Sequence, residues 1–196
     1  MTKIKCTLVG SFFVGKSTLI KTFLNGSYHG FYQPAVYDFY CIDIMYENTM
    51  IQLKIQDTND CESIENECKY VFPDTNIFIV CFSLVCPNSL EKINFYVDYI
   101  KKRFRKSIFI LVGLKSDIRD EMLEQKKGDY PNCFIPVEIE KCEQKKIEIN
   151  ALDYIECSSM KYYNVQKVFE LAIMYSIKYS KQNNHNDDIN SCCNIF

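Results

Sequence analysis

The sequence predicts an α/β fold, in which a mostly parallel sheet carries helices on both faces. Strand-like and helix-like segments alternate along the chain, which is typical of parallel strands joined by helical crossovers. Several apolar runs are nearly continuous, as expected of strands that are buried on both sides. The length of 196 residues suits one domain with a well-buried core.

The first half of the chain is expected to form four strands and one helix. The helix follows the first strand, because Leu19, Ile20, Phe23 and Leu24 share one helical face and Asn25-Gly26 supplies a stop signal. The dipeptide Glu47-Asn48 separates the second strand from the third and favours an antiparallel hairpin. The expected strands are residues 4–9, 39–46, 50–57 and 77–82.

The second half is expected to add two strands and three helices. A helix begins at Pro87-Asn88 and keeps apolar residues three and four positions apart as far as Phe104. Residues 108–112 and 154–156 read as strands, and residues 165–177 carry the apolar stripe of a last helix. Between them, residues 118–150 are charged and contain breakers, which predicts an excursion with one helix. We therefore expect a domain over residues 1–180 and a polar, flexible tail over 181–196.

Charge and hydropathy exclude several classes of protein. The net charge of −2 and the isoelectric point near 5.8 give no overall attraction to nucleic acid, so no nucleic-acid partner is expected. The N-terminus lacks the regions of a signal peptide, and the longest apolar run, residues 77–86, is too short to span a bilayer. We expect a cytoplasmic protein without a transmembrane helix.

The eleven cysteines raise the question of disulfides or a metal site. Cys6, Cys41, Cys81 and Cys157 lie inside apolar, strand-like runs, where a thiol behaves as a small buried hydrophobe. The chain has no CxxC pair and its two histidines are far apart, which argues against zinc.

A phosphate-binding loop stands between the first strand and the first helix. Residues Gly10 to Ser17 read GSFFVGKS, which fits the pattern GxxxxGK[ST]. In such a loop the backbone N–H groups and the helix N-terminus hold phosphate, the lysine reaches the β- and γ-phosphates, and the serine hydroxyl binds Mg²⁺. An ordinary glycine-rich turn is the alternative. The candidate phosphate-site residues are Gly10, Phe13, Val14, Gly15, Lys16, Ser17 and Thr18.

A second motif distinguishes guanine from adenine. Gly113-Leu114-Lys115-Ser116-Asp117 follows a strand at its carboxyl end, where doubly wound sheets bind ligands. A carboxylate at Asp117 can accept hydrogen bonds from guanine N1–H and its exocyclic amine, a donor pair that adenine lacks. Lys115 would lie along the base, and backbone N–H groups near Ser158 and Ser159 would face the guanine carbonyl. This motif alone also fits a solvated turn.

Together these residues carry a resemblance to the Rho/Rac branch of the Ras-like small GTPases along nearly the whole chain. Residues 4–6, 32–38 and 81–87 are similar to Rho patterns, and the charged excursion after Asp117 resembles the Rho helical insert. The resemblance implies a P-loop NTPase fold with a six-stranded sheet, GTP or GDP with Mg²⁺, and effectors and regulators that bind two switch loops. It assigns Asp57 to the metal beside Ser17, Tyr28 to the guanine, and Tyr32, Pro34, Ala35, Asp57, Thr58, Asp60 and Cys61 to the switches.

The chain departs from the family where the family does its chemistry. Phe12 stands in place of a glycine beside the γ-phosphate, and Cys61 in place of the glutamine that orients water, so no intact catalytic residue is expected. Ala35 lacks the hydroxyl of a metal-binding threonine, and Asp60 brings a carboxylate towards an anionic group. Leu114 replaces an asparagine or threonine that ties the base loop to the phosphate loop.

The last four residues, Cys193-Asn194-Ile195-Phe196, fit the prenylation pattern C-a-a-X, and a terminal phenylalanine favours geranylgeranylation. One prenyl chain needs a second signal for stable attachment. The tail has no polybasic patch, which makes Cys192 the expected palmitoylation site. The expected location is the cytoplasmic face of the plasma membrane or of endomembranes, with the lipid in the inner leaflet.

Three functions are open at this point. The first is a Rho-like GTPase that binds guanine nucleotide, hydrolyses it slowly or not at all, and acts as a membrane-attached switch. The resemblance to the family implies that this switch acts in signalling to the actin cytoskeleton or to vesicles. The second is a pseudoGTPase scaffold with little nucleotide, suggested by Ala35, Asp60 and Leu114. The third, an ATP-using P-loop kinase, lacks arginine-bearing lid segments and is disfavoured by Lys115 and Asp117.

Overall fold

The protein forms a six-stranded sheet in the order β2-β3-β1-β4-β5-β6. The computed structural model describes residues 1–30, 39–58, 67–124 and 133–192, with the backbone alone for residue 67 and for residues 182–192. All neighbouring strands are parallel except β2 and β3, which form the expected antiparallel hairpin. The strands are β1 (Thr2–Val9), β2 (Phe39–Tyr46), β3 (Thr49–Gln56), β4 (Ile77–Ser83), β5 (Phe109–Leu114) and β6 (Tyr154–Cys157). The predicted α/β fold is confirmed.

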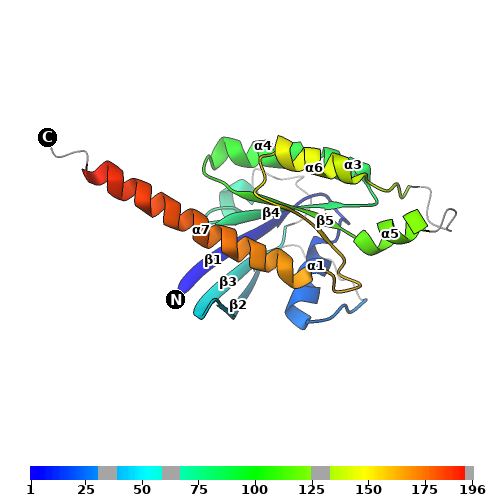
Figure 1. Ribbon diagram of the computed structural model, residues 1–196, viewed down its shortest axis with the longest axis horizontal. Helices are drawn as coiled ribbons and strands as arrows, with labels where there is room; N and C mark the ends of the chain where they lie inside the picture. The colour runs from blue at the N-terminus through cyan, green and yellow to red at the C-terminus, as the bar shows by residue number, and fades with distance from the viewer. Residues whose placement is uncertain (31–38, 59–66, 125–132, 193–196) are drawn as a thin grey trace.

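Helices cover both faces of this sheet (Figure 1). On one face α1 and α7 pack over the strands, and on the other lie α3, α4 and α6, while α5 sits beyond the carboxyl end of β5. The helices are α1 (Lys16–Asn25), α3 (Pro87–Glu91), α4 (Ile93–Arg103), α5 (Ser116–Glu124), α6 (Ile139–Glu148) and α7 (Val165–Cys192), with a π-helical turn, η1 (Glu67–Val71), before β4.

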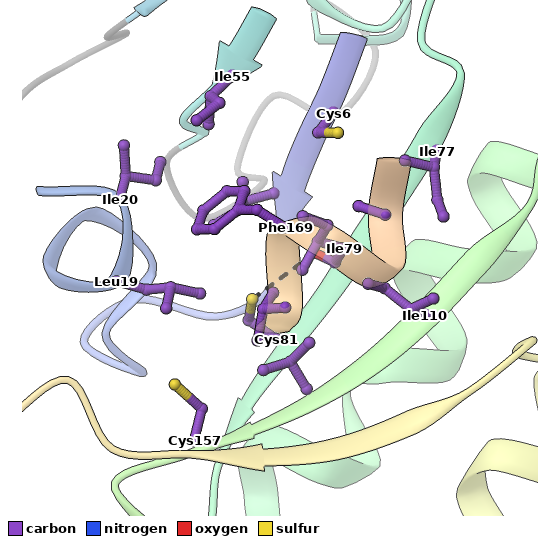
Figure 2. Packing of buried hydrophobic residues seen from close by; sticks show 14 of the residues in the cluster. Cys6, Leu19, Ile20, Ile55, Ile77, Ile79, Cys81, Ile110, Cys157 and Phe169 are labelled. Atoms are coloured by element: carbon purple, nitrogen blue, oxygen red, sulfur yellow. Dashed lines mark hydrogen bonds between the residues drawn. The ribbon is translucent and has the colours of Figure 1, made fainter. Parts of the chain in front are cut away.

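The sheet has a buried core on each side. Figure 2 shows the core beneath α7, where Phe169 lies among aliphatic side chains of the central strands. Phe169 also stacks on Phe23 of α1, with 4.0 Å between ring centroids. Burial of this kind supplies most of the favourable free energy of folding and holds the β1–α1 turn in place.

Three of the four strand cysteines lie in this core as expected. Cys6, Cys81 and Cys157 are fully buried (Figure 2), and the pKa of each thiol is raised because burial disfavours the thiolate. The prediction was wrong for Cys41, which is exposed. Cys41 belongs to β2, an edge strand whose odd-numbered residues face away from the core, so that exposed and half-buried residues alternate along it.

Three helices differ from their predicted extent. The helix expected from Pro87 to Phe104 is divided at Lys92 into α3 and α4. The charged segment after residue 115 contains two helices, α5 and α6, where one was expected. Instead of giving way to a flexible tail at residue 181, α7 continues to Cys192 and projects beyond the sheet (Figure 1). Its polar residues include no glycine or proline, so nothing in the backbone ends the helix earlier.

In the described part of the chain, no helix combines the length and the apolar character needed to cross a membrane.

Candidate functional site

The loop after β1 is held in its shape by two glycines. Gly10 has a φ of +146°, and a Cβ atom at this position would lie only 2.1 Å from the carbonyl oxygen of Cys81 on β4. Gly15 has a φ of +114° and forms the N-cap of α1. Both conformations favour residues without a side chain. The loop therefore passes directly over β4 and points the N-terminus of α1 at the enclosed space, as a phosphate cradle requires.

Lys16 reaches back across this loop. Its side chain is buried, and its ammonium group donates hydrogen bonds to the carbonyl oxygens of Gly10 at 2.6 Å and Ser11 at 2.9 Å. A buried cation is thereby placed at the loop, in a side chain that also lines the adjoining cavity. Such a group attracts an anion.

Ser17 and Asp57 meet at the other side of the loop. The Ser17 hydroxyl donates a hydrogen bond to Oδ2 of Asp57, and Asp57 is buried at the end of β3. The next residue, Thr58, donates its hydroxyl to the carbonyl oxygen of Leu8 at 2.7 Å, which fastens the end of β3 to β1. The parallel pairing of β1 with β3 thus brings a hydroxyl and a carboxylate, 40 residues apart in sequence, into contact. Both are oxygen groups of the kind that hard cations prefer.

Two adjoining cavities open along this edge of the sheet. The first has a volume of about 250 Å³ and contains most of the phosphate-loop side chains. The second, of about 160 Å³, lies between the loop and the segments after β5 and β6. Gly15, Thr18 and Lys115 line both, so the cavities form one elongated site. The first is lined by Phe12, Phe13, Gly15, Lys16, Ser17, Thr18, Thr58 and Lys115, and the second by Val14, Gly15, Thr18, Tyr28, Leu114, Lys115, Asp117, Ile118, Ser159 and Met160.

Lys115 joins the two halves of the site. It has a φ of +64°, and its ammonium group donates a hydrogen bond to the carbonyl oxygen of Phe13 at 2.7 Å, across 102 residues of sequence. Burial lowers the pKa of Lys115, and the nearby groups of Cys86 and Asp117 act in the opposite direction. The lysine therefore fastens the turn between β5 and α5 to the loop that follows β1.

The second cavity gathers the residues expected at the base. Asp117 lies in the first turn of α5, and Ser159 follows β6. Ser158 does not line this cavity: its backbone pairs with that of Tyr163, and its hydroxyl accepts a hydrogen bond from the N–H of Lys161 at 3.0 Å, so that it shapes the loop from behind. Met160 and Ile118 also line this cavity. Neither was predicted, although each is adjacent in sequence to a predicted residue, Ser159 or Asp117.

Two phenyl rings stand at the mouth of the phosphate cavity. Phe12 is 45% exposed and Phe13 is 79% exposed, with 6.2 Å between ring centroids. Phe13 has a φ of +60°, which costs free energy for a residue with a side chain. Both rings line the cavity that also contains Lys16 and Ser17, so a ligand that fills this cavity would contact them.

Other predicted residues lie outside the described part of the chain. These include the switch residues Tyr32, Pro34, Ala35, Asp60 and Cys61 and the lipidation candidate Cys193, and for Cys192 only the backbone is described.

Comparison with known proteins supports the assignment that the site suggests. The sequence model of the Ras family matches residues 5–178. The Rho-related GTP-binding protein RhoV of Bos taurus is 29% identical to this chain over 177 residues, which cover 90% of this chain and 75% of that protein, and the RhoV proteins of Homo sapiens and Mus musculus match to the same extent. With the phosphate loop, the six-stranded sheet and this similarity in agreement, the chain belongs to the Ras family as a Rho-type small GTPase.

Proposed function

We propose that this Rho-type protein binds GDP and GTP together with Mg²⁺, hydrolyses GTP slowly or not at all, and acts as a switch on the cytoplasmic face of a membrane. One observation carries the proposal: the cavity around Lys16 and the cavity around Asp117 adjoin and share three lining residues. A ligand that fills both must combine an anionic group with a group that offers hydrogen-bond donors to a carboxylate.

A guanine nucleotide has this combination. Its phosphates would meet the Lys16 ammonium and the N-terminus of α1, and its N1–H and exocyclic amine would donate to Asp117. Tyr28 and Met160, which line the base cavity, supply apolar surface for the flat ring. Adenine presents no matching donor pair to Asp117, so guanine is the favoured base.

The residues present also fit Mg²⁺. Ser17 and Asp57 supply a hydroxyl and a carboxylate, the hard oxygen ligands that this ion prefers, and they already lie within hydrogen-bond contact. Phosphate oxygens and water would complete its coordination. When bound, the ion would neutralise part of the phosphate charge. Ala35, outside the described residues, would contribute no hydroxyl to it.

Slow hydrolysis follows from the side chains around the phosphate site. A phenyl ring at Phe12 occupies space beside the phosphate, where this reaction requires an oriented water and room for an arginine from a partner. Cys61 offers a thiol, a weak donor, in place of an amide. Neither residue can orient the attacking water. Signalling by such a protein would depend on nucleotide exchange and on effectors and regulators that bind its switch loops.

Nucleotide content and turnover test the proposal. The protein is purified in Mg²⁺ and denatured, and the released nucleotide is identified by chromatography; we expect about one GDP or GTP per chain. In single turnover, GTP should be hydrolysed well below the intrinsic Ras rate of roughly 4 × 10⁻⁴ per second. Hydrolysis at or above that rate would contradict the slow-turnover proposal.

A nucleotide-poor scaffold is the second candidate, and Leu114 favours it. This buried side chain lies against Gly15, with 3.6 Å between its Cδ1 and the position of a Cβ on that glycine, and it offers no hydrogen bond to the phosphate loop. If the purified protein released no nucleotide and bound no added GDP or GTP, the scaffold would be the better description.

Membrane attachment rests on the C-a-a-X motif at Cys193 and on the neighbouring Cys192. We expect Cys193→Ser to move the protein from the membrane fraction of cells to the soluble fraction. Cys192→Ser should weaken attachment, because a single prenyl chain binds a bilayer only reversibly. An unchanged membrane fraction in both variants would contradict lipid anchoring.

A further inference from the structure

The two segments that would hold the guanine base come from different elements. Asp117 lies in the first turn of α5, and Ser159 lies in the loop that follows β6. Both line the base cavity. The relative position of α5 and β6 therefore sets the distance between the Asp117 carboxylate and the backbone of the second loop.

A partly buried ion pair connects these two elements. The Arg119 side chain, 8% exposed, donates from Nη1 to Oε1 of Glu156 at 2.5 Å and from Nη2 to Oε2 at 2.6 Å. This is a bidentate arrangement, in which two parallel hydrogen bonds fix orientation as well as distance. Arg119 comes two residues after Asp117, and Glu156 comes two residues before Ser158.

Further contacts fix both members of the pair. Arg119 also donates from Nε and Nη2 to Oδ1 of Asp120, at 2.9 and 2.8 Å. Oε1 of Glu156 accepts a hydrogen bond from the hydroxyl of Tyr154 at 2.8 Å, and the backbone carbonyl of Glu156 accepts one from the Asn164 side chain at 2.8 Å. The hydrogen bonds that Arg119 itself donates to Glu156 are the main reason why the pKa of Arg119 is raised. The guanidinium therefore stays charged.

We propose that Arg119 and Glu156 are positioning residues for guanine recognition: their ion pair holds Asp117 at the distance from the Ser158–Ser159 loop that the base requires. Neither side chain lines the cavity, so the pair acts through Asp117 and the loop. An ion pair withdrawn from water adds little net stability compared with apolar residues, whereas the geometry of this bidentate pair is specific. This inference rests on the proposed guanine-nucleotide function.

The test compares two nucleotides that differ at one donor. IDP lacks the exocyclic amine of GDP, so the ratio of their affinities reports how well Asp117 faces the base. In Arg119→Lys, which keeps the charge and loses the planar fork, we expect the GDP-to-IDP affinity ratio to fall by about threefold or more. Glu156→Gln should lower the ratio in the same direction.

Lys161→Met is the matched control. Lys161 forms an exposed ion pair with Glu121 at 3.5 Å, which also joins the loop after β6 to α5. Because exposed pairs contribute little, the affinity ratio of this variant should equal that of the parent protein. A purely structural role for Arg119 would lower the melting temperature without changing the ratio.

The outcomes separate this inference from the proposed function. If the parent protein binds neither GDP nor IDP, the proposed function fails. If the parent prefers GDP and both Arg119→Lys and Glu156→Gln keep that preference, the positioning role is wrong. Melting curves recorded beside the titrations select a temperature at which each variant is folded. Glu156→Gln keeps the size of the side chain but replaces one of the two acceptor oxygens with an amide donor, so it decides the question where Arg119→Lys unfolds.

Discussion

Replacing Lys16 with methionine tests the phosphate site most directly. The ammonium group of Lys16 lies inside the loop and already forms two hydrogen bonds, of 2.6 and 2.9 Å, to backbone carbonyl groups. A bound phosphate would offer it charged oxygens in a site of reduced dielectric. Hydrogen bonds that involve a charged group contribute about 1.5–3 kcal/mol each to the free energy of binding. Two such bonds from Lys16 to the phosphate would therefore contribute about 3–6 kcal/mol. This free energy corresponds to a loss of roughly 10²- to 10⁴-fold in affinity.

Equilibrium titration with a fluorescent GDP analogue in Mg²⁺ measures this loss. Lys178→Met, a change at an exposed position of α7 far along the chain from the loop, removes the same charge and should leave the affinity unchanged. Circular dichroism establishes that the Lys16→Met protein is folded at the temperature of the titration. A Lys16→Met protein that is folded and binds GDP within about threefold of the parent would refute the phosphate-cradle interpretation.

The remaining predictions concern the glycine, the metal ligand and the thiols. Gly10→Ala should lower the free energy of unfolding in urea by about 3 kcal/mol, because its Cβ would lie 2.1 Å from the Cys81 carbonyl oxygen. Gly26 has a φ of +69° and no atom within 4 Å of its Cβ position, so Gly26→Ala should lower the free energy of unfolding by only about 1–2 kcal/mol. Equal losses in the two variants would contradict the close contact between residue 10 and the Cys81 carbonyl oxygen. Asp57→Asn should reduce the gain in GDP affinity on adding Mg²⁺ by about tenfold, and an unchanged gain would remove Asp57 from the metal site. Burial raises the pKa of Cys157 from 9.0 to about 12, so at about pH 8 mass spectrometry should find the exposed Cys41 alkylated before Cys157, and comparable rates would contradict this burial. Since the unfolded thiol ionises first, Cys157 should also make the protein less stable as pH rises from 9.0 towards 12.

The features that could be predicted are formed by residues that follow one another closely in the sequence. The phosphate loop occupies eight consecutive residues, and its glycines and lysine have roles that follow from backbone conformation and charge alone. The hairpin was equally local: Glu47 and Asn48 have φ angles of +44° and +61°, as a tight turn between antiparallel strands requires. Such features are predictable because every atom involved lies within a few residues.

The errors arose where burial or helix length depends on distant parts of the chain. Cys41 lies in an apolar run like that of Cys6, but β2 is an edge strand and β1 is central, so only Cys6 is covered on both sides. The end of α7 was misplaced because a polar composition was taken to end the helix, although no residue there breaks it.

The sequence by itself determined the fold class, the loop at residues 10–17 and the place of Asp117 after a buried strand, because these depend on periodicity and on residues adjacent in the chain. Only the tertiary structure decided three contacts. Lys115 donates a hydrogen bond to the carbonyl oxygen of Phe13, Ser17 donates one to Asp57, and Arg119 forms an ion pair with Glu156. Those contacts join residues from 37 to 102 positions apart. Their existence follows from the order in which parallel strands stack, because that order brings the carboxyl ends of β1, β3, β5 and β6 to one edge of the sheet.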